Sequence, residues 1–155
     1  MIYAVTGKHT MLTEEEKWYV RKIVKRNVLR RKSNKLVSGM AFGVDTEAIL
    51  AVWGLLPFEN ITCTVPGTAQ HNWGLVERLE GLGANIIKCP TLHTARDTFL
   101  NRDKVTIDQL PRSSRGVLLG FPNKPTFYRS GTWATINEAE RQGKKFRLYP
   151  LINAV

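Results

Sequence analysis

The stretch SGMAFGVDTEAIL, residues 38–50, places several small residues directly before an apolar segment. It follows Lys35-Leu36-Val37, which has the composition expected at the end of a strand. A strand, a glycine-rich turn and a helix start, in that order, are typical of a place where backbone N–H groups meet a phosphate. The same pattern is typical of a tight turn whose glycines only permit φ > 0. The stretch alone leaves both interpretations open.

Short apolar runs alternate with helical patterns along the rest of the chain. The runs are IYAVT (2–6), KLVS (35–38), ITCTV (61–65), ANIIKC (84–89), RGVLLGF (115–121) and KFRLYPL (145–151). Helices are predicted after Thr13 and at about 45–56, 72–82, 94–109 and 131–142. Unbroken apolar runs are typical of parallel strands that are buried on both faces. The order predicts a single α/β domain over residues 1–155: a doubly wound, Rossmann-like fold with a mostly parallel sheet of about six strands and helices on both faces.

The helix between the first two apolar runs carries clear end signals. Thr13 and Glu16 have the spacing of a capping box, in which each side chain accepts a hydrogen bond from the other residue's amide. The last turn leads into Arg30, Arg31 and Lys32, which suit the negative end of a helix dipole. The residues expected to face the core are Val20, Ile23, Val24 and Val28.

The chain is strongly basic, with 23 Lys and Arg against 13 Asp and Glu and a formal net charge of +10. Nine of the basic residues lie between Lys17 and Lys35, mostly on the first predicted helix. Such an excess favours polyanionic partners, nucleic acid first. A solvated helix face explains the same cluster, so both interpretations stand.

The composition also bears on the cellular location. No apolar run approaches the roughly 18 residues of a membrane span, and the start MIYAVTGKHT lacks the features of a signal peptide. Cys63 and Cys89 lie in strand-like segments without metal-ligand spacing. We expect a cytoplasmic protein with reduced core cysteines, a disulfide being the alternative, and no membrane partner.

Four turns follow predicted strands and should meet at one edge of the sheet, where such folds bind ligands. They are TGKHT (6–10), SGMAFGVD (38–45), PGTAQHN (66–72) and the loop before SGTWATINEA (130–139). All four are rich in Gly, Ser, Thr or His. This clustering favours a ligand site over four unrelated turns.

Several of these segments resemble a known family. SGMAFGVDTEA (38–48) resembles the glycine motif of the DNA-processing protein A family, called DprA or Smf. SGTWATINEAERQGKKF (130–146) resembles a segment of the wider SLOG superfamily, which includes the "lonely guy" (LOG) nucleotide hydrolases and YspA-like proteins. VTGKH (5–9) lies where the family has V-x-G-S-R, although this chain has Lys8 and His9 after the glycine. FLNRDKVTI (99–107) lies where many members have an R-N or R-K pair before a helix. The resemblance implies a nucleotide- or single-stranded-DNA-binding protein acting in DNA processing or recombination, and a homodimer or higher oligomer.

The resemblance also implies an alternative function, a LOG-like nucleoside 5′-monophosphate phosphoribohydrolase with Arg102 and Glu138 as catalytic residues. A third alternative is a nucleotide-sensing protein. The chain departs from the LOG pattern because it lacks the double glycine and has Thr135, not Glu, three residues after Thr132. We therefore favour a binding protein over an N-glycosidic hydrolase.

The candidate nucleotide- or phosphate-binding residues share the predicted carboxyl edge of the sheet. They are Gly7, Lys8, His9, Ser38, Gly39, Ala41, Gly43, Asp45, Arg102, Ser130, Gly131 and Thr132. Gly39 and Gly43 should let backbone amides approach an anion, and we expect Gly43 to serve binding more than turn geometry. Asp45 is expected to cap the helix or occupy its first turn, with a ligand contact as the alternative.

Other side chains near this edge have two interpretations each. The guanidinium of Arg102 could grip two phosphate oxygens, or form a surface pair with Asp103. Trp133 could stack on a base or pack in the core. His71 and His93 are isolated from other ligand types, so we expect neither a metal nor a cofactor.

Overall fold

The computed structural model describes residues 1–66, 72–125 and 130–151. Six strands form one sheet in the order β4-β3-β2-β1-β5-β6, and every neighbouring pair is parallel. The strands are β1 (Ile2–Gly7), β2 (Lys35–Ser38), β3 (Ile61–Pro66), β4 (Asn85–Cys89), β5 (Gly116–Phe121) and β6 (Lys145–Leu148). The predicted fold class is confirmed: a Rossmann-like α/β sheet of parallel strands.

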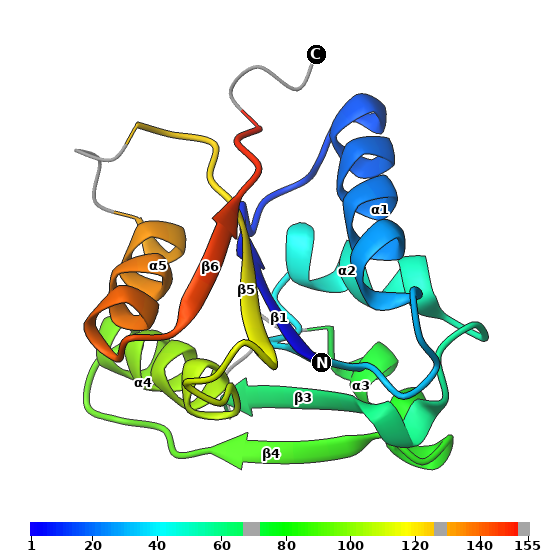
Figure 1. The fold of residues 1–155 in the computed structure, drawn as a ribbon. Coiled ribbons are helices and arrows are strands. Elements are labelled where there is room, and N and C mark those ends of the chain that lie inside the picture. Colours follow the sequence, from blue (N-terminus) through cyan, green and yellow to red (C-terminus); the bar gives the residue numbers. More distant parts are fainter. Residues whose placement is uncertain (67–71, 126–129, 152–155) are drawn as a thin grey trace.

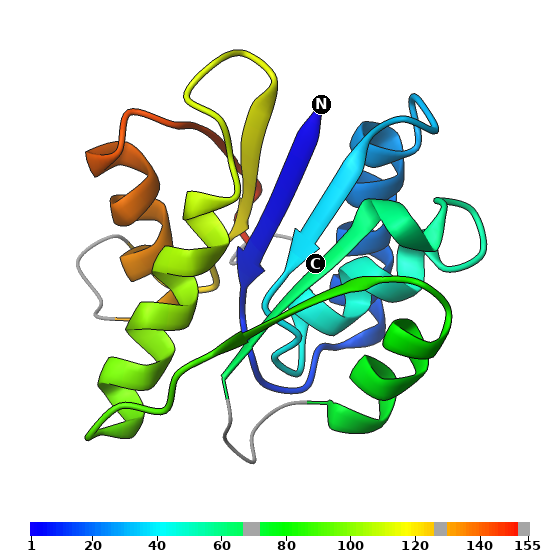
Figure 2. The ribbon, with the colours of Figure 1, turned by 90° about the horizontal axis from the view of Figure 1, so that it is seen from below.

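Helices cover both faces of the sheet (Figures 1 and 2). They are α1 (Glu14–Val28), α2 (Val44–Val52), α3 (Trp73–Gly81), α4 (Ala95–Asp108) and α5 (Gly131–Arg141), with a 3₁₀ turn at Phe58–Asn60. The first three lie on one face and α4 and α5 on the other. The chain changes direction between β1 and β5, so the connections leaving these two strands diverge. Ligands of such folds bind at this switch point.

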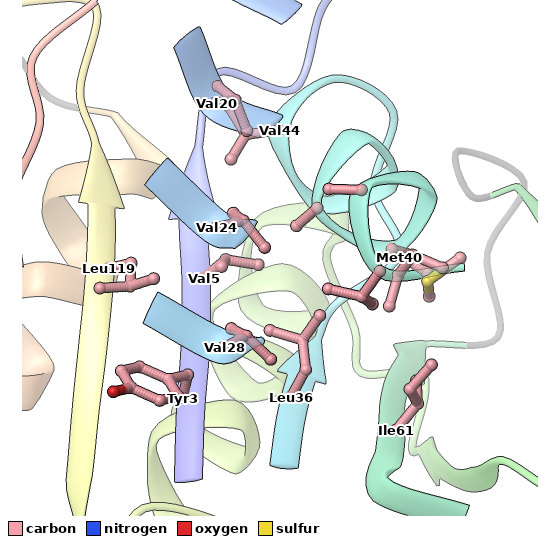
Figure 3. Packing of buried hydrophobic residues seen from close by; sticks show 14 of the residues in the cluster. Tyr3, Val5, Val20, Val24, Val28, Leu36, Met40, Val44, Ile61 and Leu119 are labelled. Atoms are coloured by element: carbon pink, nitrogen blue, oxygen red, sulfur yellow. The ribbon is translucent and has the colours of Figure 1, made fainter. Parts of the chain in front are cut away.

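Helix α1 begins and packs as the sequence predicts. The Thr13 hydroxyl accepts a hydrogen bond from the Glu16 amide at 3.1 Å, and the Glu16 carboxylate accepts one from the Thr13 amide at 2.9 Å. Val20, Val24 and Val28 are fully buried and face the strands across the main core (Figure 3). The amphipathic pattern therefore fixes which face of α1 meets the sheet.

Two element ends differ from prediction. The helix predicted over 45–56 ends at Val52, because Trp53 has ψ 124° and Gly54 has φ 72°, outside the helical region. The last strand ends at Leu148, two residues before Pro150. Strand β5 is buried throughout, whereas the edge strands β4 and β6 are partly exposed.

The structure also bears on the expectations about the cysteines, membrane spans and His71. Cys63 and Cys89 are buried and free, which excludes the alternative disulfide. Burial raises the pKa of the Cys63 thiol to about 12. Across residues 1–66, 72–125 and 130–151, every helix is too short or too polar to cross a bilayer. His71, with most of the turn PGTAQHN, lies outside the described residues.

Candidate functional site

A cavity of about 1170 Å³ opens at the carboxyl end of β1, beside the switch point. The end of β1, the turn after β2, one side of α4 and the start of α5 line it. It lies at the sheet edge where the sequence predicts a ligand site. Nine of the twelve candidate binding residues line it: Gly7, His9, Gly39, Ala41, Asp45, Arg102, Ser130, Gly131 and Thr132. Lys8, Ser38 and Gly43 do not line it and support the fold beside it.

The turn after β2 uses its amides within the protein. The Ser38 hydroxyl accepts a hydrogen bond from the Met40 amide at 3.2 Å and donates one to the Asp45 carbonyl at 2.9 Å. The Asp45 carboxylate accepts a long bond, 3.4 Å, from the Ala41 amide. Met40 is held at φ 58° with its side chain fully buried. The carboxylate of Asp45 thus occupies the position that the sequence assigned to an anionic ligand.

Gly43 has a structural role that the sequence analysis underestimated. Its φ is 89°, and a Cβ at this position would lie 2.1 Å from the Lys8 carbonyl oxygen and 2.8 Å from that of Thr10. The same Lys8 carbonyl accepts a hydrogen bond from the Val44 amide at 2.9 Å. Gly43 does not line the main cavity. The expectation that it serves anion approach more than turn geometry is therefore corrected.

Two other candidates also support the fold next to the cavity. The Lys8 ammonium pairs with the Glu16 carboxylate at 3.1 Å, which ties the turn after β1 to the capping box of α1. Lys8 is not among the residues that line the cavity. Gly7 lines it, and a Cβ there would lie 2.5 Å from the Val44 side chain. Close packing between β1 and α2 therefore requires a glycine at position 7.

A buried ionic cluster forms one wall of the cavity. The Arg102 guanidinium donates to the Asp103 carboxylate at 2.9 Å and to the Gly39 carbonyl at 2.8 Å. A Cβ on Gly39 would lie 2.8 Å from Arg102 Nη1 and 3.0 Å from Asp45 Oδ2. Gly39 therefore lets the arginine and the aspartate approach the turn together. Arg102 pairs with Asp103 as predicted for the structural alternative, but the arginine is buried and not on the surface.

Burial shifts the pKa of both carboxyl groups in this cluster. It raises the pKa of Asp45 to about 7, against the opposing effect of the Arg102 guanidinium, and the nearby Asp103 carboxylate adds to the rise. Burial likewise raises the pKa of Asp103 above its ordinary value, although Arg102 opposes this change. Two acids with raised pKa values therefore share one arginine at the cavity wall.

The start of α5 faces the same cavity with its backbone. The Ser130 hydroxyl accepts a hydrogen bond from the Trp133 amide at 3.2 Å. Gly131 and Thr132 line the cavity, and their amides, the first two of the helix, have no acceptor within α5. Among the residues that the structure describes, a Cβ on Gly131 would meet Asp103 Oδ2 alone, at 4.0 Å. The positive end of the helix dipole therefore lies at the cavity.

Basic and aromatic side chains complete the cavity. His9 and Arg96 line it and are exposed to solvent. Phe42 and Phe99 also line it, and Phe42 is about half exposed. Trp133 lines the cavity while packing against the core under α5, and its indole N–H donates to the Lys124 carbonyl at 2.8 Å. Both roles considered for Trp133 are compatible with this position.

Glu138 lies apart from the cavity. Its carboxylate accepts hydrogen bonds from Arg141 at 2.9 Å and from Gln142 at 2.8 Å. The bond from Arg141 is the main reason that the pKa of Glu138 falls to about 2. Arg102 lines the cavity and Glu138 does not, so the structure does not bring the expected catalytic pair to one site.

The sequence analysis missed most of the contribution of α4. Arg96, Phe99, Asp103 and Thr106 all line the cavity. Their spacing of three or four residues places them on one side of a helix. Polar and aromatic residues at this spacing, on a helix that follows a strand, are the signal that could have identified them.

Comparison with known proteins places the fold. No family model and no curated protein matches the chain. Among solved structures, it is similar to DNA processing protein A (DprA) from Streptococcus pneumoniae, with a TM-score of 0.67 and 18% sequence identity. The chain has a DprA-like fold. The alignment covers 98% of this chain and 52% of that one, so the chain spans about half the length of the DprA structure it matches.

Proposed function

We propose that the cavity binds a nucleoside phosphate, either as a free nucleotide or as a nucleotide of a single DNA strand. The observation that carries the proposal is that the start of α5 opens into a cavity with both basic and aromatic walls. A helix N-terminus offers amide donors to a phosphate, and aromatic rings offer stacking surfaces to a base. A nucleotide combines these two chemical features.

Each part of such a ligand has partners in the cavity. The amides of Gly131 and Thr132 would bind the phosphate, with Arg96 adding charge at the mouth. Asp45 and Asp103 could accept hydrogen bonds from sugar hydroxyls or donate them when protonated. Arg102 would keep Asp103 and the Gly39 carbonyl in position, because it already donates to both.

Binding is better supported than N-glycosidic hydrolysis. The hydrolase hypothesis relied on Glu138, which is bonded to Arg141 and does not line the cavity. Binding requires only the groups that are already gathered there. A role in DNA processing is part of this proposal, and it is supported by the likeness to the structure named DNA processing protein A.

Thermal unfolding with added ligands tests the proposal. Nucleoside monophosphates, the matching nucleosides, inorganic phosphate and short single strands would be compared. A ligand at a hundred times its Kd should add about 2.7 kcal/mol of stability, which raises the Tm of a protein of this size by roughly 5–10 °C. A shift with monophosphates identifies a free nucleotide, whereas a shift with strands alone identifies DNA.

A pair of arginine variants shows whether the effect comes from the cavity. Arg96→Ala should reduce the shift produced by monophosphates and leave the shift by nucleosides unchanged. Arg115→Ala is the matched control, because Arg115 is exposed just before β5 and does not line the cavity. The proposal would be contradicted if no nucleotide or strand stabilised the protein. It would also be contradicted if Arg96→Ala and Arg115→Ala reduced the monophosphate-induced Tm shift equally.

A further inference from the structure

The outer face of α1 carries several exposed basic residues. Trp18, Lys22, Lys25 and Arg26 are exposed on it, opposite the valines that face the core. The three cations follow Trp18 by four, seven and eight residues, a spacing that places all four side chains on one side of the helix. Arg30, Arg31, Lys32 and Lys35 continue the exposed basic sequence into β2. We call these eight residues the outer α1 surface.

The charges of this surface are not neutralised by the protein. Of the nine basic residues between Lys17 and Lys35, Lys17 pairs with Glu14 and Arg21 with Glu47. The other seven form no ion pair with any residue that the structure describes. A solvated helix face normally carries both signs of charge. Here the acidic residues of α1, Glu14 to Glu16, are confined to its first turn.

The aromatic residue on this surface is also unusual. Trp18 is 63% exposed, and the Lys22 ammonium lies 4.7 Å from its ring centroid. An indole of this size is normally largely buried. A ring held open beside several cations is the arrangement that proteins use to stack a base while binding its backbone.

Strand β6 extends the surface sideways. Arg147 is exposed on this edge strand, and its guanidinium donates to the Asn27 side chain of α1 at 2.9 Å. Arg147 therefore lies beside α1 at Asn27, the residue that follows Arg26 in the sequence. The charged surface is wider than a single helical row.

The outer α1 surface is separate from the cavity. Helix α1 begins at the carboxyl edge of the sheet and runs back toward the opposite edge, where Lys35 pairs with Met1 through their backbones (Figure 1). None of its eight residues lines the cavity. Binding at one site can therefore be tested without altering the other.

We propose that the outer α1 surface binds single-stranded nucleic acid, with its cations on the phosphates and Trp18 stacked on a base. Single strands are favoured over duplexes because a duplex keeps its bases stacked on each other and offers no free face to Trp18. An acidic protein segment would also meet the cations, but it would not account for the open indole. The proposal does not depend on the cavity ligand.

Salt dependence of strand binding gives a direct test. The Kd of a labelled oligothymidylate longer than about 16 nucleotides would be measured by fluorescence anisotropy across a salt series. Removing three cations in Lys22→Ala/Arg26→Ala/Arg30→Ala should reduce the slope of log K against log salt by about 2, since each single-strand contact contributes about 0.7. The control Arg78→Ala/Lys88→Ala/Lys104→Ala removes the same charge from exposed sites elsewhere and should leave the slope nearly unchanged.

Variants at Trp18 test the stacking contact. Trp18→Ala should weaken strand binding by about fivefold or more, and Trp18→Phe should recover part of the loss. A duplex of the same sequence should bind more weakly than the strand and show no dependence on Trp18. These side chains are exposed, so circular dichroism and Tm should show that all variants fold.

Several results would overturn the proposal. Equal reductions of the salt slope in the two triple variants would show that net charge alone controls strand binding. A Trp18→Ala variant that binds the labelled strand as tightly as the wild-type chain would exclude a stacking site for single strands. Displacement of the labelled strand to the same extent by heparin and by an acidic peptide would exclude it as well. Strand binding that depends on Arg96 and not on the outer α1 surface would assign the strand to the cavity. If the wild-type chain bound strands through the outer α1 surface but bound no mononucleotide, the result would contradict the proposed function and leave this proposal intact.

Discussion

Two helices start beside the cavity and use their first amides differently. Ser38, Gly39, Ala41 and Gly43 precede α2, and α5 begins with Ser130 as its cap and Gly131 as its first residue. Before α2, the Val44 amide donates to the Lys8 carbonyl and the Ala41 amide to the Asp45 carboxylate. At α5, Ser130 caps the Trp133 amide, and Gly131 and Thr132, whose amides have no acceptor within the helix, line the cavity.

This difference shows that a glycine-rich turn before a helix is not sufficient evidence for an anion site. The turn before α2 already contains its own acidic group, the Asp45 carboxyl, and a backbone carbonyl fills the space beside Gly43. Beside Gly131, the one described group within 4 Å of the Cβ position is the Asp103 carboxylate, at 4.0 Å. The glycines of the first turn allow close packing, whereas Gly131 leaves space for a ligand.

The largest effect is expected at Gly43. Gly43→Ala should cost about 4 kcal/mol, because the strain of a positive φ adds to overpacking against the Lys8 carbonyl. For a chain of this length, the Tm should fall by roughly 10 °C or more. Gly54→Ala is the matched control, since Gly54 also has a positive φ, 72°, but has open space around its Cβ position. It should cost only about 1 kcal/mol.

Thermal or denaturant unfolding of both glycine variants checks this prediction. A Gly43→Ala protein that melts like Gly54→Ala but fails to bind nucleotide would reverse the comparison. The first turn would then be a ligand contact rather than a packing element.

A smaller effect is expected at Asp45, through pH. Its carboxyl has a pKa of about 7 in the folded chain, against an ordinary value of 3.8. Between these values the folded state holds a proton that the unfolded chain has lost, so stability falls as pH rises from about 4 to about 7. Asp45→Asn removes this titration. It should flatten the decline in Tm over that range and add up to a few kcal/mol above pH 7.

Paired measurements of Tm between pH 4 and pH 8 check the sign. Equal slopes for the wild-type chain and Asp45→Asn would show that Asp45 does not titrate in this range. Lower stability of the variant at pH 8 would show that its charge is needed to hold Arg102 and the turn together.

The fold was largely predictable from the sequence because its signals are local. Unbroken apolar runs predicted β1 and β5, and the Thr13–Glu16 capping box predicted the start of α1. The end of α2 was less predictable. The apolar residues after Val52 continue the helical pattern, and only the backbone of Trp53 and Gly54 shows that the helix has stopped.

The site was less predictable because its contacts join distant parts of the chain. Arg102 and Gly39 are 63 residues apart, and their hydrogen bond depends on how α4 crosses the sheet. The pairing of Lys8 with Glu16, which turns a candidate phosphate ligand into a structural contact, depends on the path of the loop between β1 and α1. Nine of the twelve candidate residues line the cavity, but residue type did not show that Lys8, Ser38 and Gly43 support the fold instead.

The most direct test of the central claim compares two substitutions at Gly131. Proline is tolerated at the first position of a helix and removes the amide there, and Ser130, at φ −148° and ψ 157°, has the extended backbone that suits a residue before proline. Gly131→Ala keeps the amide, and within the described part of the chain its Cβ meets Asp103 Oδ2 alone, at 4.0 Å. Nucleotide affinity would be measured by calorimetry for both variants. We expect Gly131→Pro to bind about tenfold more weakly or worse, because a hydrogen bond to a charged phosphate is lost, with Gly131→Ala close to the wild-type chain. Equal affinities for the two variants, both folded, would contradict the claim that the start of α5 holds the phosphate.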